Sequence, residues 1–360
     1  TKTCPVFRNR KNAELTRKLY EAAPVLVNEV SGENPWRISF LRMFDMTNDS
    51  SLFRSKEKLE DDGFSLMGNK FVLKDEVYLP LYEGKMFMPY DHRFAHVIIT
   101  DNVARPGQPE VLSDEDHLNY YHMVMPRFWV NSARVKKELG DDYPFGWLIG
   151  FKNVTSPTNE RTFLSTILPI SGVGNSTPLI LPSSKALACG SSALIANLNS
   201  FVFDFVARQK MGNVNLNFFI VEQLPVIPPD RYTPELLDFI VPRVVELTYT
   251  AWDLLPFAED VLKEVGEETW SRWFPENPLD GEGKPAPFHW DEERRAALRA
   301  ELDGLYAHLY QLDREDLDYI LDTFPIVKRK DEARYGEFRT KRLVLEAYDR
   351  LAPLGSRKQL

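Results

Sequence analysis

The hydrophobic pattern of this chain changes near residue 230, and that change limits the folds open to it. Before it, short runs rich in aromatic and β-branched residues alternate with turn residues, which predicts strands. After it, apolar residues recur at helical spacing, and Thr233 and Pro234 are suited to cap and begin a helix. Runs of strands followed by runs of helices are typical of α+β proteins. We therefore predict a β-rich region at about 35–230 and a mostly helical region at 231–360.

The period of each segment predicts the individual elements. A helix is expected over 11–23, because Leu15 and Leu19 lie four residues apart. A second helix is expected over 194–210, from the stripe Leu194, Leu198, Phe201 and Phe205. The strand candidates are 36–44, 70–84, 85–90, 121–130, 145–154, 161–170, 177–182 and 218–229. The later helices are expected at 234–255, 257–270, 291–311, 313–323 and 331–351, with a Gly/Pro-rich loop at 274–289.

Charge and cysteine content limit the possible partners. The chain has a net charge of −9, but residues 231–360 hold 27 acidic against 19 basic residues, and Arg161 to Phe203 contains no acid. A nucleic-acid partner requires a local positive face rather than a positive total, so this composition permits DNA binding. Cys4 and Cys189 are far apart, which fits a reducing cytoplasm. No run approaches the ~20 apolar residues of a membrane span, so no membrane association is expected.

Several chemistries lack their sequence motifs. The Asn/Asp-Pro-Pro-Tyr/Phe loop of amino-methyltransferases is absent, as is a Gly-x-Ser-x-Gly elbow. The sequence Gly172-Val173-Gly174 leads into a further strand, so we interpret it as a turn rather than a cofactor loop. Paired histidines (His92 with His96, His117 with His122) lack a third ligand, so we expect no metal site. We assign no catalytic residue.

One nuclease-like pattern provides an alternative function. Glu83-Gly84-Lys85 is a Glu-x-Lys triplet at a strand, with Asp75 upstream. In a metal-dependent nuclease, such carboxylates would hold Mg²⁺ and the lysine would steady the attacking water. The usual Pro-Asp context is missing, and Gly84 equally suits a simple turn.

Six segments, taken in their order and spacing, resemble one family. They are CPVFRNRKNAELTRKLYEAAPVL (4–26), LPLYEGKMFMPYDHRFA (79–95), MPRFWV (125–130), WLIGFKNVTSPTNERTFLSTILP (147–169), MGNVNLNFFIVEQLPVIPP (211–229) and LDREDLDYILDTFPIVKRKDEARYGEFRTKRLVLEAYD (312–349). Together they resemble the C-terminal specificity region, of the TaqI-like kind, of type IIG-like bacterial adenine-N6 DNA methyltransferases. That family includes restriction–modification fusions and methyltransferases of phage-defence systems.

The resemblance implies a division of labour. A catalytic domain, absent here, would bind S-adenosylmethionine and methylate a flipped adenine. This fragment would hold no cofactor itself, would recognise double-stranded DNA and would contact the catalytic domain of the same parent chain. Residues 1–34 would then be a linker helix leaving the methyltransferase core, and 35–230 the target-recognition domain. The start at Thr1, without methionine or a signal peptide, favours a fragment of a longer protein.

A DNA reader requires cations and polar groups for phosphates, and Arg, Asn or Gln for base edges. Each candidate also has an ordinary structural interpretation, because exposed cations are usually solvated and asparagines favour turns. The predicted DNA-contact residues are Lys85, Tyr90, His92, Arg93, Arg127, Lys152, Arg161, Asn175, Ser176, Lys210, Asn213 and Asn215.

A basic stretch near the C-terminus is either a solvated helix face or a phosphate-binding one. It contains Lys328, Arg329, Lys330, Arg334, Arg339, Lys341 and Arg342. The acidic helices at 253–293 are expected to dock on another part of the parent protein. A protein-interaction scaffold of a defence complex is therefore a third hypothesis.

Overall fold

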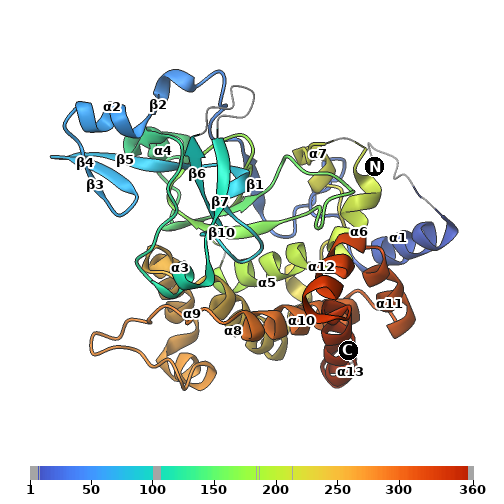
Figure 1. The fold of residues 1–360 in the computed structure, drawn as a ribbon. Helices are drawn as coiled ribbons and strands as arrows, with labels where there is room; N and C mark the ends of the chain where they lie inside the picture. Colours follow the sequence, from blue (N-terminus) through green and yellow to red (C-terminus); the bar gives the residue numbers. More distant parts are fainter. Residues whose placement is uncertain are drawn as a thin grey trace.

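The computed structural model describes residues 7, 9–99, 107–183, 185, 187–212 and 214–355. Mainly antiparallel sheets form in the first half of the chain, and helices dominate the second half (Figure 1). The predicted α+β class is therefore confirmed.

A four-stranded antiparallel sheet lies between two hydrophobic cores. Its order is β1 (Ile38–Leu41), β12 (Leu179–Pro182), β9 (Trp147–Phe151) and β10 (Ser165–Pro169). Trp147 and Ile149 pack in the principal core, while Leu148 between them packs in the second core. Because both faces are covered, every residue of β9 and β10 is buried, and buried and exposed positions do not alternate.

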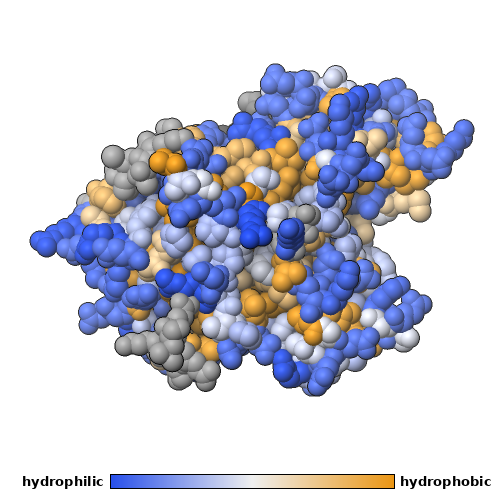
Figure 2. Space-filling view, turned by 180° about the vertical axis from the view of Figure 1, so that it is seen from behind, coloured by the Kyte–Doolittle hydropathy of each residue, from blue (hydrophilic) through white to orange (hydrophobic). Residues whose placement is uncertain are grey.

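A second sheet projects from the first half of the chain. Its order is β2 (Phe53–Arg54), β8 (Trp129–Asn131), β5 (Glu76–Tyr82), β4 (Lys70–Leu73) and β3 (Ser65–Met67), with β11 (Gly172–Val173) parallel to β5. The hairpin β6 (Ala95–Ile99) and β7 (Gly107–Val111) is separate. Figures 1 and 2 show the arm of α2, β3 and β4 and the loop after α9 projecting on one side, with a hollow between them. The short helices of this half are α2 (Lys56–Asp61), α3 (Asp114–Leu118) and α4 (Ser132–Leu139).

Some of the longer helices begin where the sequence supplies a capping side chain. Asn9 caps the first helix by accepting from the N–H of Asn12, and Thr233 caps α8 by accepting from Leu236. The helices are α1 (Arg10–Ala22), α5 (Ala188–Asn199), α6 (Phe201–Lys210), α7 (Phe218–Val221), α8 (Pro234–Thr248), α9 (Leu255–Trp273), α10 (Glu292–Leu309), α11 (Arg314–Asp322), α12 (Pro325–Tyr335) and α13 (Arg339–Gly355). Short 3₁₀ turns are η1 (Ser50–Leu52), η2 (Gly84–Met86), η3 (Pro229–Arg231) and η4 (Trp252–Leu254).

Two long predicted helices are each divided in two. The stripe at 194–210 forms α5 and α6, which meet at 60° at Ser200, whose extended backbone and side chain cap α6. The segment 331–351 is divided by Gly336, whose φ of +76° is the left-handed conformation that ends α12. Neither break changes which apolar residues are buried, which is why periodicity alone did not show it. Among the described residues, no single helix is long and apolar enough to cross a membrane.

Three strand predictions are wrong. Residues 218–229 form α7 and then an irregular segment, because prolines at 225, 228 and 229 have no N–H for a ladder. Within the described residues, this segment pairs with another strand at one position, an isolated bridge between Pro225 and Val25. Residues 85–90 form η2 and a turn, and of 121–130 only the last two residues enter β8. Aromatic content at these places serves packing rather than a strand.

The principal hydrophobic core crosses the predicted boundary at residue 230. It contains Leu15 of α1, Phe151 of β9, Phe205 of α6 and Val241 of α8, all at most 2% exposed. The first part of the chain therefore packs directly on the helical part. The division into domains at 34 and 230 stays a prediction.

Candidate nucleic-acid interface

Arg93, a predicted DNA contact, is fully buried. Its guanidinium donates to the backbone carbonyls of His117, Asn119, His122 and Thr250 at 2.8–3.1 Å. These bonds join the segment around α3 to the helical half of the molecule. Because Arg93 exposes no surface, the candidate interface excludes it.

His92 and Lys210 are also buried. His92 Nε2 lies 2.8 Å from Asp253 Oδ1. Burial alone would raise the pKa of Asp253, but His92 and Arg93 outweigh it and hold that pKa below its usual value. Lys210 is 4% exposed, and its Nζ donates to Gln223 Oε1 at 3.4 Å. These predicted contacts are placed in the interior, so we exclude them from the interface as well.

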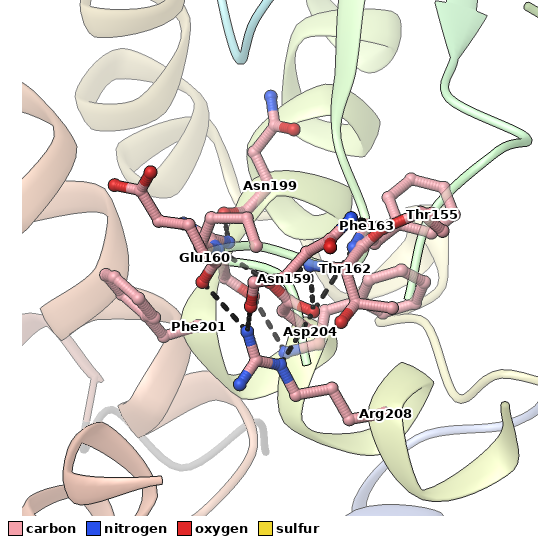
Figure 3. Close-up of polar contacts among 12 residues, drawn as sticks. Thr155, Asn159, Glu160, Thr162, Phe163, Asn199, Phe201, Asp204 and Arg208 are labelled. Carbon is pink, nitrogen blue, oxygen red and sulfur yellow. Dashed lines mark hydrogen bonds and ion pairs between the residues drawn. The ribbon is translucent and has the colours of Figure 1, made fainter. Parts of the chain in front are cut away.

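Arg161 belongs to a buried ionic cluster around Asp204. Figure 3 shows Asp204 in this cluster with Thr162, Phe163 and Arg208. Asp204 accepts from Arg161 Nε at 2.6 Å and from the backbone N–H groups of Thr162 and Phe163 at 3.0–3.2 Å. Arg208 lies 3.6 Å from the same carboxylate and donates to two carbonyls of the loop before β10. The cluster therefore fixes the β9–β10 loop on α6. Arg161 pairs with Asp204, not with the adjacent Glu160.

A different group of predicted residues converges at one margin of the sheets. The hydroxyl of Ser176 accepts from Gly84 N at 2.9 Å, and its carbonyl accepts from Asn153 N at 3.0 Å. Asn153 O in turn accepts from Leu216 N at 2.8 Å. Hydrogen bonds therefore join four segments that are separate in sequence, at Gly84, Asn153, Ser176 and Leu216. We call this surface the polar edge and define it by Lys85, Lys152, Asn175, Ser176 and Asn215.

Lys85 and Arg127 meet beside the start of β7. Lys85 Nζ donates to Gly107 O at 2.8 Å and lies 3.0 Å from Glu83 Oε2. The Arg127 guanidinium lies 4.6 Å from the Phe128 ring centre, and its Cδ would lie 3.5 Å from a Cβ on Gly107. Both cations are half-buried. Arg127 is thus adjacent to the polar edge through this contact.

Lys152 has the most perturbed environment of these cations. Its Nζ lies 5.6 Å from the Phe87 ring centre, 5.9 Å from that of Phe94 and 3.4 Å from the Met88 sulfur. Burial lowers the pKa of Lys152 to about 8, opposed by the nearby charge of Asp91. At neutral pH this lysine is therefore still mostly charged, with little solvation to lose on binding an anion.

The asparagines of the polar edge are held loosely. Asn175 Nδ2 donates to Asp45 Oδ2 at 3.3 Å, and Asn215 pairs with Val154 through an isolated backbone bridge. Val154 and Val214 beside them are each 62% exposed. Asn213 lies outside the described residues. The polar edge therefore combines amide groups with exposed apolar surface.

The Glu-x-Lys triplet lies far from Asp75, the upstream acid of the nuclease-like pattern. Asp75 lies in the turn before β5, whereas Glu83 follows the end of β5. At ~3.3 Å per strand residue these carboxylates are roughly 25 Å apart, too far to share a metal ion. Among the described residues, no group of three or more His, Cys, Asp or Glu is arranged to hold a metal.

The glycines at 172 and 174 are explained by packing. A Cβ on Gly172 would lie 2.3 Å from a Val130 methyl, and one on Gly174 would lie 2.9 Å from the Met46 sulfur. The segment pairs with β5 and then turns into β12. No helix N-terminus follows it, so it does not fit a nucleotide-cofactor loop.

Tyr90 and Arg161 line a cavity of about 790 Å³ between the 88–94 segment, the α5–α6 junction and helices α10, α12 and α13. Part of the C-terminal basic stretch reaches the same cavity. We call it the arginine-lined cavity, and its cationic side chains are Arg161, Arg295, Arg299, Lys330, Arg334 and Arg339.

Comparison with models of known protein families and with curated protein sequences finds no match for this chain.

Sequence reasoning missed several of these residues. Asp204 had a usable signal, because it is the first acid after the acid-free tract and a lone carboxylate in an apolar helix. Trp290 had none, because it lies in the segment 253–293, whose acidity favoured a docking role, and Arg295 lies just after that segment. Asn153 links the polar edge through its backbone, which residue type does not reveal.

Proposed function

We propose that this chain is a sequence-specific double-stranded DNA recognition module of an adenine-N6 methyltransferase or restriction–modification enzyme. Methyl transfer would be performed by a catalytic domain of the same parent protein that binds S-adenosylmethionine. The family resemblance supports this, and so does the convergence of residues from 85 to 215 on the polar edge.

The polar edge supplies both kinds of contact that a reader requires. Lys85 and Lys152 are partly exposed cations suited to phosphates, which set position without reading sequence. Asn175 and Asn215 carry amide groups that can donate and accept together at an adenine edge. Among the described residues, neither amide donates to a buried side chain, so each could turn toward a base, Asn175 by leaving Asp45.

Local charge makes this surface compatible with DNA despite the net charge of −9. The acid-free tract from Arg161 to Phe203 contains Asn175 and Ser176. Arg42, exposed and 5.8 Å from the Phe218 ring centre, lies on the segment before Asp45. Most of the excess negative charge lies instead in 231–360, the helical part of the chain.

The test is binding to a pool of random duplex DNA over a salt series, with the bound sequences identified. We expect affinity to fall steeply with salt and a short motif to be enriched. Lys85→Met should reduce the salt slope by about 1 without altering the motif, and Asn175→Ala should relax one position of it. Lys263→Met, on the exposed face of α9, is the matched control.

Binding that is unaffected by both polar-edge substitutions would reject this surface as the reader. Absence of binding at low salt would remove autonomous DNA recognition, and salt-insensitive protein binding would then favour a scaffold.

A further inference from the structure

The arginine-lined cavity has the size of a small-molecule site. At about 790 Å³ it falls within the roughly 300–1,000 Å³ of typical ligand pockets. Its walls come from both halves of the chain, from the 88–94 segment to α13. Such a space between packed elements is a common location for a ligand.

Every carboxylate of the cavity wall has a partner within the protein. Glu160 pairs with Lys330 and Glu292 with Arg299. Asp91 accepts from Arg93 N, Asp303 from Phe201 N and Asp331 from Thr340 N, at 2.6–2.9 Å. These contacts use the acids of the wall to hold its own structure.

Two cations of the wall have no such partner. Among the described residues, neither Arg295 nor Arg334 forms an ion pair with a carboxylate. Arg295 is 3% exposed, donates only to the carbonyls of Leu247 and Tyr90, and has an Nε without a hydrogen-bond partner. Burial lowers its pKa to about 10, so it is still charged at neutral pH. Arg334 is exposed at the mouth on α12. The surplus charge of the cavity is therefore positive.

Aromatic rings orient these guanidinium groups. Arg295 lies 3.7 Å from the Trp290 ring centre, and Arg334 lies 5.2 Å from that of Tyr335. A stacked guanidinium keeps its edge N–H groups in a fixed plane, which suits a phosphate or carboxylate. Tyr90 and Phe94 add further ring surface, on which a planar heterocycle can stack.

We propose that the arginine-lined cavity binds a single nucleotide, with its phosphate on Arg295 and Arg334 and its base on the aromatic wall. The nucleotide is either free or an unpaired residue of a DNA strand, since both present the same chemistry. This site is distinct from the polar edge and does not depend on duplex recognition.

The test is calorimetric titration of the full chain with the four deoxynucleoside 5′-monophosphates, the matching nucleosides, inorganic phosphate and a five-nucleotide single strand. We expect at least one monophosphate to bind, with its nucleoside and inorganic phosphate each about tenfold weaker. Tighter binding of the monophosphate than of the single strand assigns a free nucleotide, and the reverse assigns a strand.

Two variants locate the site. Arg334→Gln should weaken binding about tenfold by removing a charge-assisted contact, and Ala333→Phe should block the mouth. Both positions are exposed on α12, so folding should be unaffected. Arg329→Gln, exposed on the same helix outside the cavity, should leave binding unchanged. No heat with any monophosphate at millimolar concentration, equal affinity for inorganic phosphate alone, or full affinity in both variants would overturn the proposal.

Discussion

The polar edge and the arginine-lined cavity both gather polar residues from distant parts of the chain, but they hold them differently. At the polar edge, hydrogen bonds such as that from Gly84 N to the Ser176 hydroxyl set the turns, and the lysines stay partly exposed. Beside the cavity, the buried carboxylate of Asp204 fixes Arg161, one cation of the cavity wall. A cation held by a fully buried carboxylate, as Arg161 is by Asp204, maintains shape, whereas a cation that keeps exposed surface or has no carboxylate partner is available to a ligand. The context of a cation, rather than its residue type, separates the two roles.

The largest expected effect of this difference is on stability at the Asp204 cluster. Asp204→Asn should lower the free energy of unfolding by about 3–5 kcal/mol, because Arg161 and Arg208 would be left as uncompensated, largely buried charges. Denaturant unfolding measures this. The control is Asp238→Asn, whose partner Arg272 is 62% exposed, and it should change stability by less than about 1 kcal/mol. A loss below about 1 kcal/mol for Asp204→Asn would show that the cluster is not what fixes the β9–β10 loop.

The contrast also shows how far the sequence predicts the structure. The period of the apolar residues identified the α+β class and α1, because burial of Leu15 and Leu19 depends on local spacing. Residue type selected Lys85, Arg93 and Arg161 equally as DNA contacts. Whether each of these side chains is exposed depends on long-range packing, such as the carbonyls that surround Arg93, and local sequence does not encode this packing.

The arginine-lined cavity was harder to predict from the sequence than the polar edge. Its parts come from segments that are about 200 residues apart, such as Tyr90 and Arg295, whose guanidinium donates to the Tyr90 carbonyl. The basic stretch was evident in the sequence, but the elements it faces were not.

The next effect in size is the pH dependence that Asp303 gives the cavity wall. Burial raises the pKa of Asp303 to about 6, opposed by Arg161 and by the N–H of Phe201. The folded state therefore keeps a proton that the unfolded state has released between about pH 4 and pH 6, so this group lowers stability as pH rises through that window.

Asp303→Asn removes that dependence. The variant should gain up to roughly 3 kcal/mol over wild type between pH 4 and 6, a difference that then stays constant above pH 6. Unfolding curves over this pH range provide the measurement. A parallel pH profile for both proteins would show that Asp303 titrates normally.

Lys152 should behave in the opposite way at the polar edge. Its pKa of about 8 lies below that of an unfolded lysine, so its charge penalises the folded state below pH 8 and the penalty is lost as pH rises from 8 toward 10.5. Lys152→Met should raise the free energy of unfolding at pH 7 by about 1 kcal/mol, reduced by the partial exposure of the side chain. The same substitution should weaken DNA binding if Lys152 contacts a phosphate. A variant that is both less stable and unchanged in DNA affinity would make Lys152 a packing residue only.

The smallest expected effect is on duplex affinity and concerns Asp45, which accepts from the amide of Asn175. Asp45 accepts from Asn175 and from the backbone N–H groups of Asn48 and Thr47, and those two backbone bonds are the main reason that its pKa is lowered. Its carboxylate therefore stays charged at neutral pH and repels phosphate. Asp45→Asn should raise affinity for non-specific duplex about two- to threefold at low salt, with the gain vanishing above ~0.3 M salt as the charge is screened. Asp141→Asn, an exposed acid in the loop after α4, should produce no such gain. Equal gains in affinity from both substitutions would show that DNA binding responds to the total charge of the protein and is not located at the polar edge.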